Sequence, residues 1–117
     1  FLNVLLSISS KENFSKSELL ISEESATTVI MTSGGYPEKY KTGAPVKGLE
    51  KVQNSLIFHA GLKFENGEHL TNGGRVLAVT SCDKKIKNAI KKSYENINKI
   101  QFENLYFRKD IGKDVIK

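Results

Sequence analysis

The sequence predicts a single α+β domain in which a mostly antiparallel sheet precedes one long, late helix. Short apolar runs with strand-like alternation are joined by glycine-rich turns, and a helical stripe follows them between residues 83 and 100. The chain has 117 residues, of which 38% are hydrophobic, including six Phe and four Tyr. Residues 1–117 therefore suit one compact domain with a real core and leave no room for a second.

The first twenty residues are expected to form a helical lead-in and a loop. Apolar residues recur there at helical spacing, namely Leu2, Leu5, Leu6 and Ile8. Residues 11–17 are polar and serine-rich, which is typical of a loop, and residues 19–21 favour either a helical turn or a strand. The chain starts with Phe1 inside the apolar run, as expected for a piece of a longer protein.

A buried strand is predicted at residues 26–33, where the sequence ATTVIMTS is β-branched and apolar. GGYP at residues 34–37 ends this strand, because two glycines and a proline cannot continue a central strand. A polar loop is expected over residues 38–48, which contain Gly43, Pro45 and Gly48.

Strict alternation predicts the next strand at residues 56–64. One side would carry Leu56, Phe58, Ala60, Leu62 and Phe64, and the other would carry Ile57, His59, Gly61 and Lys63. Asn66-Gly67 predicts a type I′ hairpin turn, because both central positions of that turn need φ > 0. The return strand starts near residue 69, is interrupted by NGGR at residues 72–75 and resumes in the apolar run 76–79.

The clearest helix is predicted at residues 83–100. Its apolar stripe consists of Ile86, Ala89, Ile90, Ile97 and Ile100, with Tyr94 near the edge. Ser81 or Asp83 is expected to cap its N-terminus. A last strand is predicted at residues 102–107, and DIG at residues 110–112 ends it.

The formal net charge of +5 raises the question of a nucleic-acid partner. Only two of the eighteen cationic residues are arginines, Arg75 and Arg108. Five lysines crowd onto the predicted helix, namely Lys84, Lys85, Lys87, Lys91 and Lys92. Since lysine is the usual surface cation, we interpret this face as solvated.

The compartment is indicated by the single cysteine, Cys82, which excludes an internal disulfide and fits a reducing environment. We expect this thiol to be buried or half-buried. No apolar run approaches the roughly 20 residues that span a bilayer. Residues 1–8 lack the basic flank and cleavage site of a signal peptide. A cytoplasmic location without membrane contact is expected.

Four strings occur in an order that is similar to one known family. They are GGYP at 34–37, FHAGLK at 58–63, TNGGRVLAVT at 71–80 and YFRKDIG at 106–112. In order and spacing they resemble the C-terminal domain of the phosphoribosylamine–glycine ligases, also called glycinamide ribonucleotide synthetases. The resemblance runs from about residue 1 to residue 116. Leu62 stands where many members carry Thr, and Lys113 replaces a bulkier residue, which does not unsettle the match.

The resemblance implies a hybrid sandwich-like domain of an ATP-grasp ligase of purine biosynthesis. ATP would phosphorylate glycine, and 5-phosphoribosylamine would attack the resulting glycyl phosphate. It also implies ATP and Mg²⁺ (or Mn²⁺) held by upstream domains, which are this domain's partners. The ATP-binding lysines, the metal-binding carboxylates and the family's Arg-x-Gly-Asp-Pro-Glu signature are absent from this sequence. The chain alone is therefore expected to bind neither cofactor, to carry no catalytic residue and to be inactive.

NGGR is the leading candidate for substrate binding. Gly73 and Gly74 would let the backbone approach a ligand and expose N–H donors, with Asn72 beside them. Arg75 adds a planar fork that matches a phosphate or carboxylate. The alternative is a β-bulge with a structural arginine salt bridge.

The other candidates are less specific. Gly34, Gly35 and Tyr36 of GGYP form either a substrate-facing loop or an exit turn. Lys109 would pair with Asp110, either near substrate or locally.

The two histidines are interpreted structurally. His59 is expected to be a hydrogen-bonded structural residue and His69 a surface strand residue. With Cys82 they show no zinc-ligand spacing, so no metal site is predicted.

A second hypothesis is a small non-catalytic module that binds RNA or a protein through the lysine-rich helix. Against it, the strands carry no aromatic pair at base-stacking positions, and the basic residues do not surround a groove. We therefore expect no nucleic-acid partner.

Overall fold

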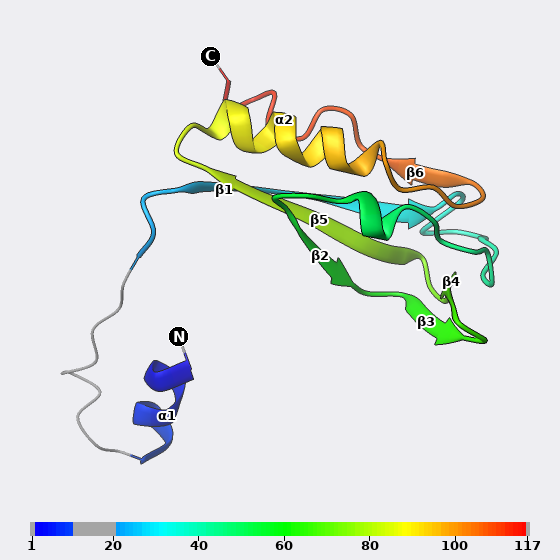
Figure 1. Ribbon diagram of the computed structural model, residues 1–117, viewed down its shortest axis with the longest axis horizontal. Coiled ribbons are helices and arrows are strands. Elements are labelled where there is room, and N and C mark those ends of the chain that lie inside the picture. Colours follow the sequence, from blue (N-terminus) through cyan, green and yellow to red (C-terminus); the bar gives the residue numbers. More distant parts are fainter. Residues whose placement is uncertain (1, 11–20, 117) are drawn as a thin grey trace.

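The computed structural model describes residues 2–10 and 21–116 (Figure 1). The expected helix at the start is α1 (Leu2–Ser10), and its apolar side chains Leu2, Leu5, Leu6 and Ile8 are exposed. The expectations for residues 11–17, and for residues 19 and 20 of the segment 19–21, lie outside the described residues.

Within the described residues, six strands form two antiparallel sheets. The larger sheet has the strand order β2-β5-β1-β6 and consists of β1 (Ser25–Ser33), β2 (Leu56–His59), β5 (Arg75–Asp83) and β6 (Leu105–Phe107). The smaller sheet is the hairpin of β3 (Leu62–Glu65) and β4 (Glu68–Thr71). The predicted α+β class with an antiparallel sheet is confirmed.

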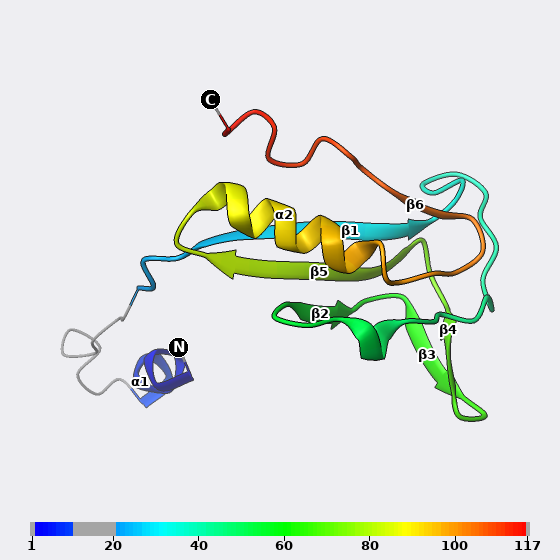
Figure 2. The same ribbon diagram turned by 45° about the horizontal axis from the view of Figure 1, so that its top comes forward.

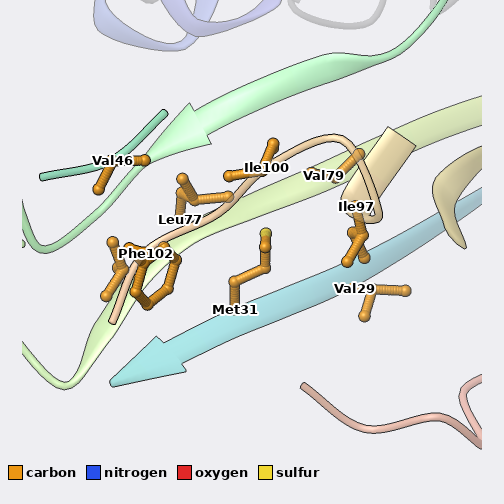
Figure 3. Packing of buried hydrophobic residues seen from close by; sticks show 9 residues of the cluster. Val29, Met31, Val46, Leu77, Val79, Ile97, Ile100 and Phe102 are labelled. Carbon is orange, nitrogen blue, oxygen red and sulfur yellow. The ribbon is translucent and has the colours of Figure 1, made fainter. Parts of the chain in front are cut away.

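The helix α2 (Ile86–Ile97) runs along β1 and β5 on one face of the larger sheet (Figures 1 and 2). The core forms between them because alternate residues of each strand point toward the helix. Figure 3 shows this packing. The buried cluster consists of Val29, Met31, Val46, Val76, Leu77, Val79, Ile97, Ile100 and Phe102.

The helix is shorter than predicted at both ends. β5 continues to Asp83, and Lys85 is still extended, so α2 begins at Ile86. Ser81 is not a cap, because it lies buried in β5, where its hydroxyl is within hydrogen-bond distance of Ser55 Oγ (2.6 Å) and Ser93 Oγ (2.9 Å). The apolar stripe outlasts the helix, since Ile100 is buried three residues beyond its end.

Asp83 does serve the start of the helix, although it is not the N-cap residue. Its carboxylate accepts hydrogen bonds from Lys92 Nζ (2.6 Å), Lys85 N (3.0 Å) and Asn88 Nδ2 (3.1 Å). The bond from Lys92 is the main cause that lowers the pKa of Asp83 to about 2. The other lysines of the predicted helix segment are exposed, as expected for a solvated face, namely Lys84, Lys85, Lys87 and Lys91.

Residues 56–64 do not form one strand, so that prediction is wrong. It breaks at Ala60 and Gly61, so β2 joins the larger sheet and β3 joins the hairpin. The alternation holds within β2, but its large side chains face outward. Phe58 is 54% exposed, whereas Ile57 packs against the core.

The Asn66-Gly67 turn is confirmed, with φ of 52° at Asn66 and 85° at Gly67. The last strand is shorter than the predicted 102–107. Phe102 is buried outside any strand, and Asn104 with φ of 55° interrupts the extended backbone before β6. The predicted loop 38–48 also contributes Val46 to the core.

Candidate functional site

Two of the glycine-rich segments meet where β1 ends and β5 begins. The N–H of Ser33 donates to the carbonyl of Gly74 at 2.8 Å, and the Ser33 hydroxyl donates to the carbonyl of Gly73 at 3.0 Å. Ser33 directly precedes GGYP, so these bonds attach that turn to NGGR. Strings separated by about forty residues thus share one end of the sheet.

The third segment, around Gly61, crosses NGGR on its other side. Gly61 N–H donates to the carbonyl of Arg75 at 2.8 Å, and Asn72 N–H donates to the carbonyl of Gly61 at 2.7 Å. A Cβ built on Gly61 would lie 2.6 Å from that Arg75 oxygen and 2.8 Å from Gly73 Cα. Only two glycines allow the chains to cross this closely.

The glycines of NGGR lie close to other protein groups, and their approach to a ligand stays a prediction. Neither has positive φ. Gly74 is buried, and a Cβ there would overlap the ring of Tyr36. Gly73 faces Gly61. Their role is to let Tyr36 and the crossing strand pack against β5.

The exposed Arg75 of β5 belongs to a row of directly opposite residues that crosses three strands. Arg75 is opposite Thr32 of β1, which in turn is opposite Tyr106 of β6. Directly opposite residues of antiparallel strands share a face of the sheet. The pairing shifts by one residue between Met31 and Thr32, so the bulge of the alternative interpretation is present. Its salt bridge is not, because Arg75 has no ion-pair partner among the described residues.

A shallow groove of about 380 Å³ lies beside this row. Its lining consists of Thr28, Val29, Ile30, Thr32, Tyr36, Arg75, Tyr106, Phe107, Arg108 and Ile111. The groove brings together Tyr36 and Arg75 from the sequence candidates. It adds Thr32, Tyr106 and Arg108, which the sequence analysis missed.

Arg108 is neutralised within the domain. Its Nε and NH2 groups donate to the two carboxylate oxygens of Asp110 at 2.9 and 2.7 Å. This two-bond pair raises the pKa of Arg108 and lowers the pKa of Asp110. Arg108, and not the predicted Lys109, is therefore the ion-pair partner of Asp110. Lys109 is exposed and does not line the groove.

The two glycines of GGYP form the turn that follows β1. Gly34 N–H donates to the carbonyl of Asn104 at 2.6 Å, and Gly35 has φ of 95°. The exit-turn interpretation thus fits Gly34 and Gly35, while Tyr36 both packs on Gly74 and lines the groove. Asn72 is exposed beside the crossing.

The histidines and the cysteine lie away from the groove. His59 is exposed, and no side chain in the described part of the protein forms a hydrogen bond with its ring, contrary to the prediction. The ring stands edge-on to His69 at 5.3 Å between centroids. Cys82 is exposed, contrary to the prediction. Across residues 2–10 and 21–116, no three His, Cys, Asp or Glu side chains gather as metal ligands would. No helix in that part of the chain is long and apolar enough to cross a membrane.

These features define a small α+β domain with one helix-covered sheet face, one open face and an arginine groove at the sheet's end. The family described as "Phosphoribosylglycinamide synthetase, C domain" matches residues 26–114. The chain belongs to this family, as the four sequence strings predicted. The match favours the ligase over the basic binding module.

Individual relatives agree. The phosphoribosylamine–glycine ligase of Fusobacterium nucleatum is 42% identical over 96% of this chain and 27% of its own length. A bifunctional purine biosynthetic protein of Pichia angusta is 42% identical over 79% of this chain and 12% of its own length. The solved phosphoribosylamine–glycine ligase of Thermotoga maritima superposes with a TM-score of 0.82 at 31% identity, over 95% of this chain and 27% of that one. The chain thus spans about a quarter of the Fusobacterium relative's length.

Proposed function

We propose that this chain is the C-terminal domain of a phosphoribosylamine–glycine ligase of purine biosynthesis in the cytoplasm. The full-length enzyme would couple ATP hydrolysis to the joining of glycine and 5-phosphoribosylamine. The proposal is carried by the exposed Arg75, which has no ion-pair partner among the described residues, in a domain that belongs to the synthetase family.

ATP and a divalent cation do not fit the residues of this domain. The described residues contain no acidic or histidine cluster that could hold Mg²⁺. The groove beside Arg75 is shallow, and its carboxylate-paired Arg108 is not available to a triphosphate. We therefore assign both to an ATP-grasp body outside these 117 residues, and we expect the isolated 117-residue segment to form no glycinamide ribonucleotide.

Arg75 is the residue that we assign to the phosphate of phosphoribosylamine. A guanidinium binds a phosphate dianion with two parallel charge-assisted hydrogen bonds. Of the two arginines in the groove, Arg108 already uses this fork on Asp110, whereas no group among residues 2–10 and 21–116 occupies the fork of Arg75. The Tyr36 ring on Gly74 and the crossing at Gly61 fix the backbone from which Arg75 projects.

The test is Arg75→Ala in the full-length enzyme. The value of kcat/KM for phosphoribosylamine should fall by an amount equal to about 1.5–3 kcal/mol, the range for a hydrogen bond to a charged group. The apparent affinity for ATP and the melting temperature should stay close to wild type. Arg75→Lys should recover only part of the loss, because an ammonium cannot reproduce the fork.

The control is Lys91→Ala, which removes an exposed cation on the solvent side of α2 and should leave all kinetic constants unchanged. A large loss of thermal stability in Arg75→Ala with unchanged substrate kinetics would show a structural arginine instead. Equal effects on phosphoribosylamine and ATP would also contradict the assignment.

A further inference from the structure

The two histidines of this chain lie ten positions apart in the sequence but touch in the fold. His59 is the last residue of β2 in the larger sheet, and His69 lies in β4 of the smaller sheet. β2 leads through the crossing at Gly61 into the hairpin of β3 and β4, which projects from the larger sheet (Figures 1 and 2). The two imidazole rings meet edge-on at the boundary of the sheets, with 5.3 Å between their centroids.

The separation of the two rings is the one that a shared metal ion requires. A ligating imidazole nitrogen lies about 2 Å from a zinc ion, which places the centre of its ring about 3 Å from the ion. Two such rings at a tetrahedral angle have their centres about 5 Å apart. The observed 5.3 Å matches this distance, so the positions of His59 and His69 suit two ligands of one ion.

Both rings are available as ligands. Within residues 2–10 and 21–116, no group forms a hydrogen bond with either imidazole, so their nitrogens are not occupied there. His69 is half-buried, and the ring of Phe64 lies 5.0 Å from its ring between centroids. This contact restricts the rotation of His69, whereas the exposed His59 can turn to complete the pair.

The hairpin carries its charged side chains on its other face. The strand pairing places Phe64 opposite His69, and these two residues share one face of the hairpin. By alternation, Lys63, Glu65 and Glu68 lie on the opposite face, where Lys63 and Glu65 form an ion pair. Within β3 and β4, therefore, no cation beside His69 repels a metal ion, and no carboxylate there replaces an imidazole as its ligand.

We propose that His59 and His69 form a binding site for one divalent transition-metal ion. Imidazole is a preferred ligand of Zn²⁺, Cu²⁺ and Ni²⁺, whereas Mg²⁺ prefers oxygen ligands. Two protein ligands leave the other coordination positions to water, which defines an open site rather than a closed structural one. Neither histidine lines the groove of Arg75, and the proposal does not depend on the ligase activity.

A bound ion would join the two sheets of the domain. His59 belongs to the larger sheet and His69 to the hairpin, so the ion would add a connection to the hydrogen bond from Asn72 to Gly61. Metal binding stabilises the folded arrangement that brings its ligands together. Binding should therefore slow the local opening of the hairpin.

The experiment titrates Zn²⁺ into the full-length protein in the absence of nucleotide and Mg²⁺, with isothermal calorimetry as the readout. The wild type is compared with His59→Ala, His69→Ala and the double variant. Glu68→Gln is the matched control, because it removes a metal-binding group next to His69 but on the other face of the hairpin. A second readout is hydrogen exchange of residues 62–71, measured by mass spectrometry with and without Zn²⁺.

A shared ion predicts that each single histidine variant binds Zn²⁺ at least about tenfold more weakly, since losing even an outer partner of a ligating histidine costs that much. The double variant should bind about as weakly as either single variant, because the first substitution already removes the pair. Glu68→Gln should bind like the wild type. Zn²⁺ should slow exchange in residues 62–71 of the wild type and leave it unchanged in the histidine variants.

Wild-type affinity in both single histidine variants would overturn the proposal. Losses that add in the double variant would also overturn it, because they would show two separate sites. An equal loss in Glu68→Gln would assign the ion to a carboxylate instead. Exchange without Zn²⁺ should be the same in all these proteins, which separates a lost ligand from a lost fold.

Discussion

The two faces of the larger sheet come from neighbouring residues of the same strands, yet their surroundings differ. Met31 and Leu77 lie on the same face as α2, beside Ile100 and Phe102, and are fully buried. On the opposite face, the open face, Ile30 and Phe58 are about half exposed. Both faces are apolar in sequence. The comparison teaches that hydrophobic content alone does not tell which face this chain covers by itself, because the covering element depends on topology.

The largest expected difference between the faces is in stability. Leu77→Ala should lower the free energy of unfolding by about 2–5 kcal/mol, because it leaves a cavity in the buried cluster that contains Ile100 and Phe102. Phe58→Ala should change it by less than about 0.5 kcal/mol in the 117-residue chain, because the ring already contacts solvent. Urea denaturation followed by circular dichroism measures both. Similar losses would mean that the open face is covered within this chain.

A second variant tests whether exposure to solvent alone makes a position tolerant of substitution. Gly67 lies at the hairpin tip with open space around it, but its φ of 85° disfavours any β-branched residue. Gly67→Val should therefore cost about 1–3 kcal/mol in the same assay. Its neighbour provides the control, since Glu68→Val in strand β4 should change stability by less than about 0.5 kcal/mol. An unchanged midpoint for Gly67→Val would contradict the strained tight turn.

The smallest expected effect concerns the helix-covered side at the start of α2. The pKa of Asp83 is lowered from 3.8 to about 2 in the folded domain, mainly by the hydrogen bond from Lys92. A lowered folded-state pKa stabilises the fold above the unfolded pKa, and the benefit is lost as pH falls toward 2. Asp83→Asn should thus melt slightly below wild type at pH 7, and the difference should shrink between pH 4 and pH 2.

Glu95→Gln is the control for this pH dependence. Glu95 is exposed on the same helix, and its carboxylate forms a surface ion pair with Lys91 Nζ at 3.7 Å. Because surface ion pairs contribute little to stability, Glu95→Gln should have little effect on melting at either pH. A melting difference for Asp83→Asn that is constant from pH 7 to pH 2 would show that the carboxylate charge is not what stabilises the turn into α2.

Local signals in the sequence predicted most of the fold. The β-branched run gave β1, Asn66-Gly67 gave the hairpin turn, and the isoleucine stripe gave α2. Each of these depends on residues near one another in the chain. The break at Ala60 and Gly61 escaped prediction because the alternation continues through it. The close approach of Gly61 to Gly73 joins residues that are distant in the sequence.

The candidate site was predicted in part, since Tyr36 and Arg75 do meet at one groove. Thr32, Tyr106 and Arg108 were missed because their place beside Arg75 depends on the register of β1 with β5 and β6, including a one-residue shift. The packing roles of Gly73 and Gly74 were also missed. A glycine that makes room for a ligand and one that makes room for a tyrosine ring look the same in a sequence.

The crossing at Gly61 has a consequence for how this domain can vary in length. The chain leaves the crossing at Leu62 and returns at Asn72, whose N–H closes the excursion on the Gly61 carbonyl. The ends of the hairpin are therefore fixed to each other whatever lies at its tip. Each doubling of a closed loop costs only about 0.6 kcal/mol of chain entropy. Residues can be inserted or removed around Asn66 while the groove and the open face keep their positions.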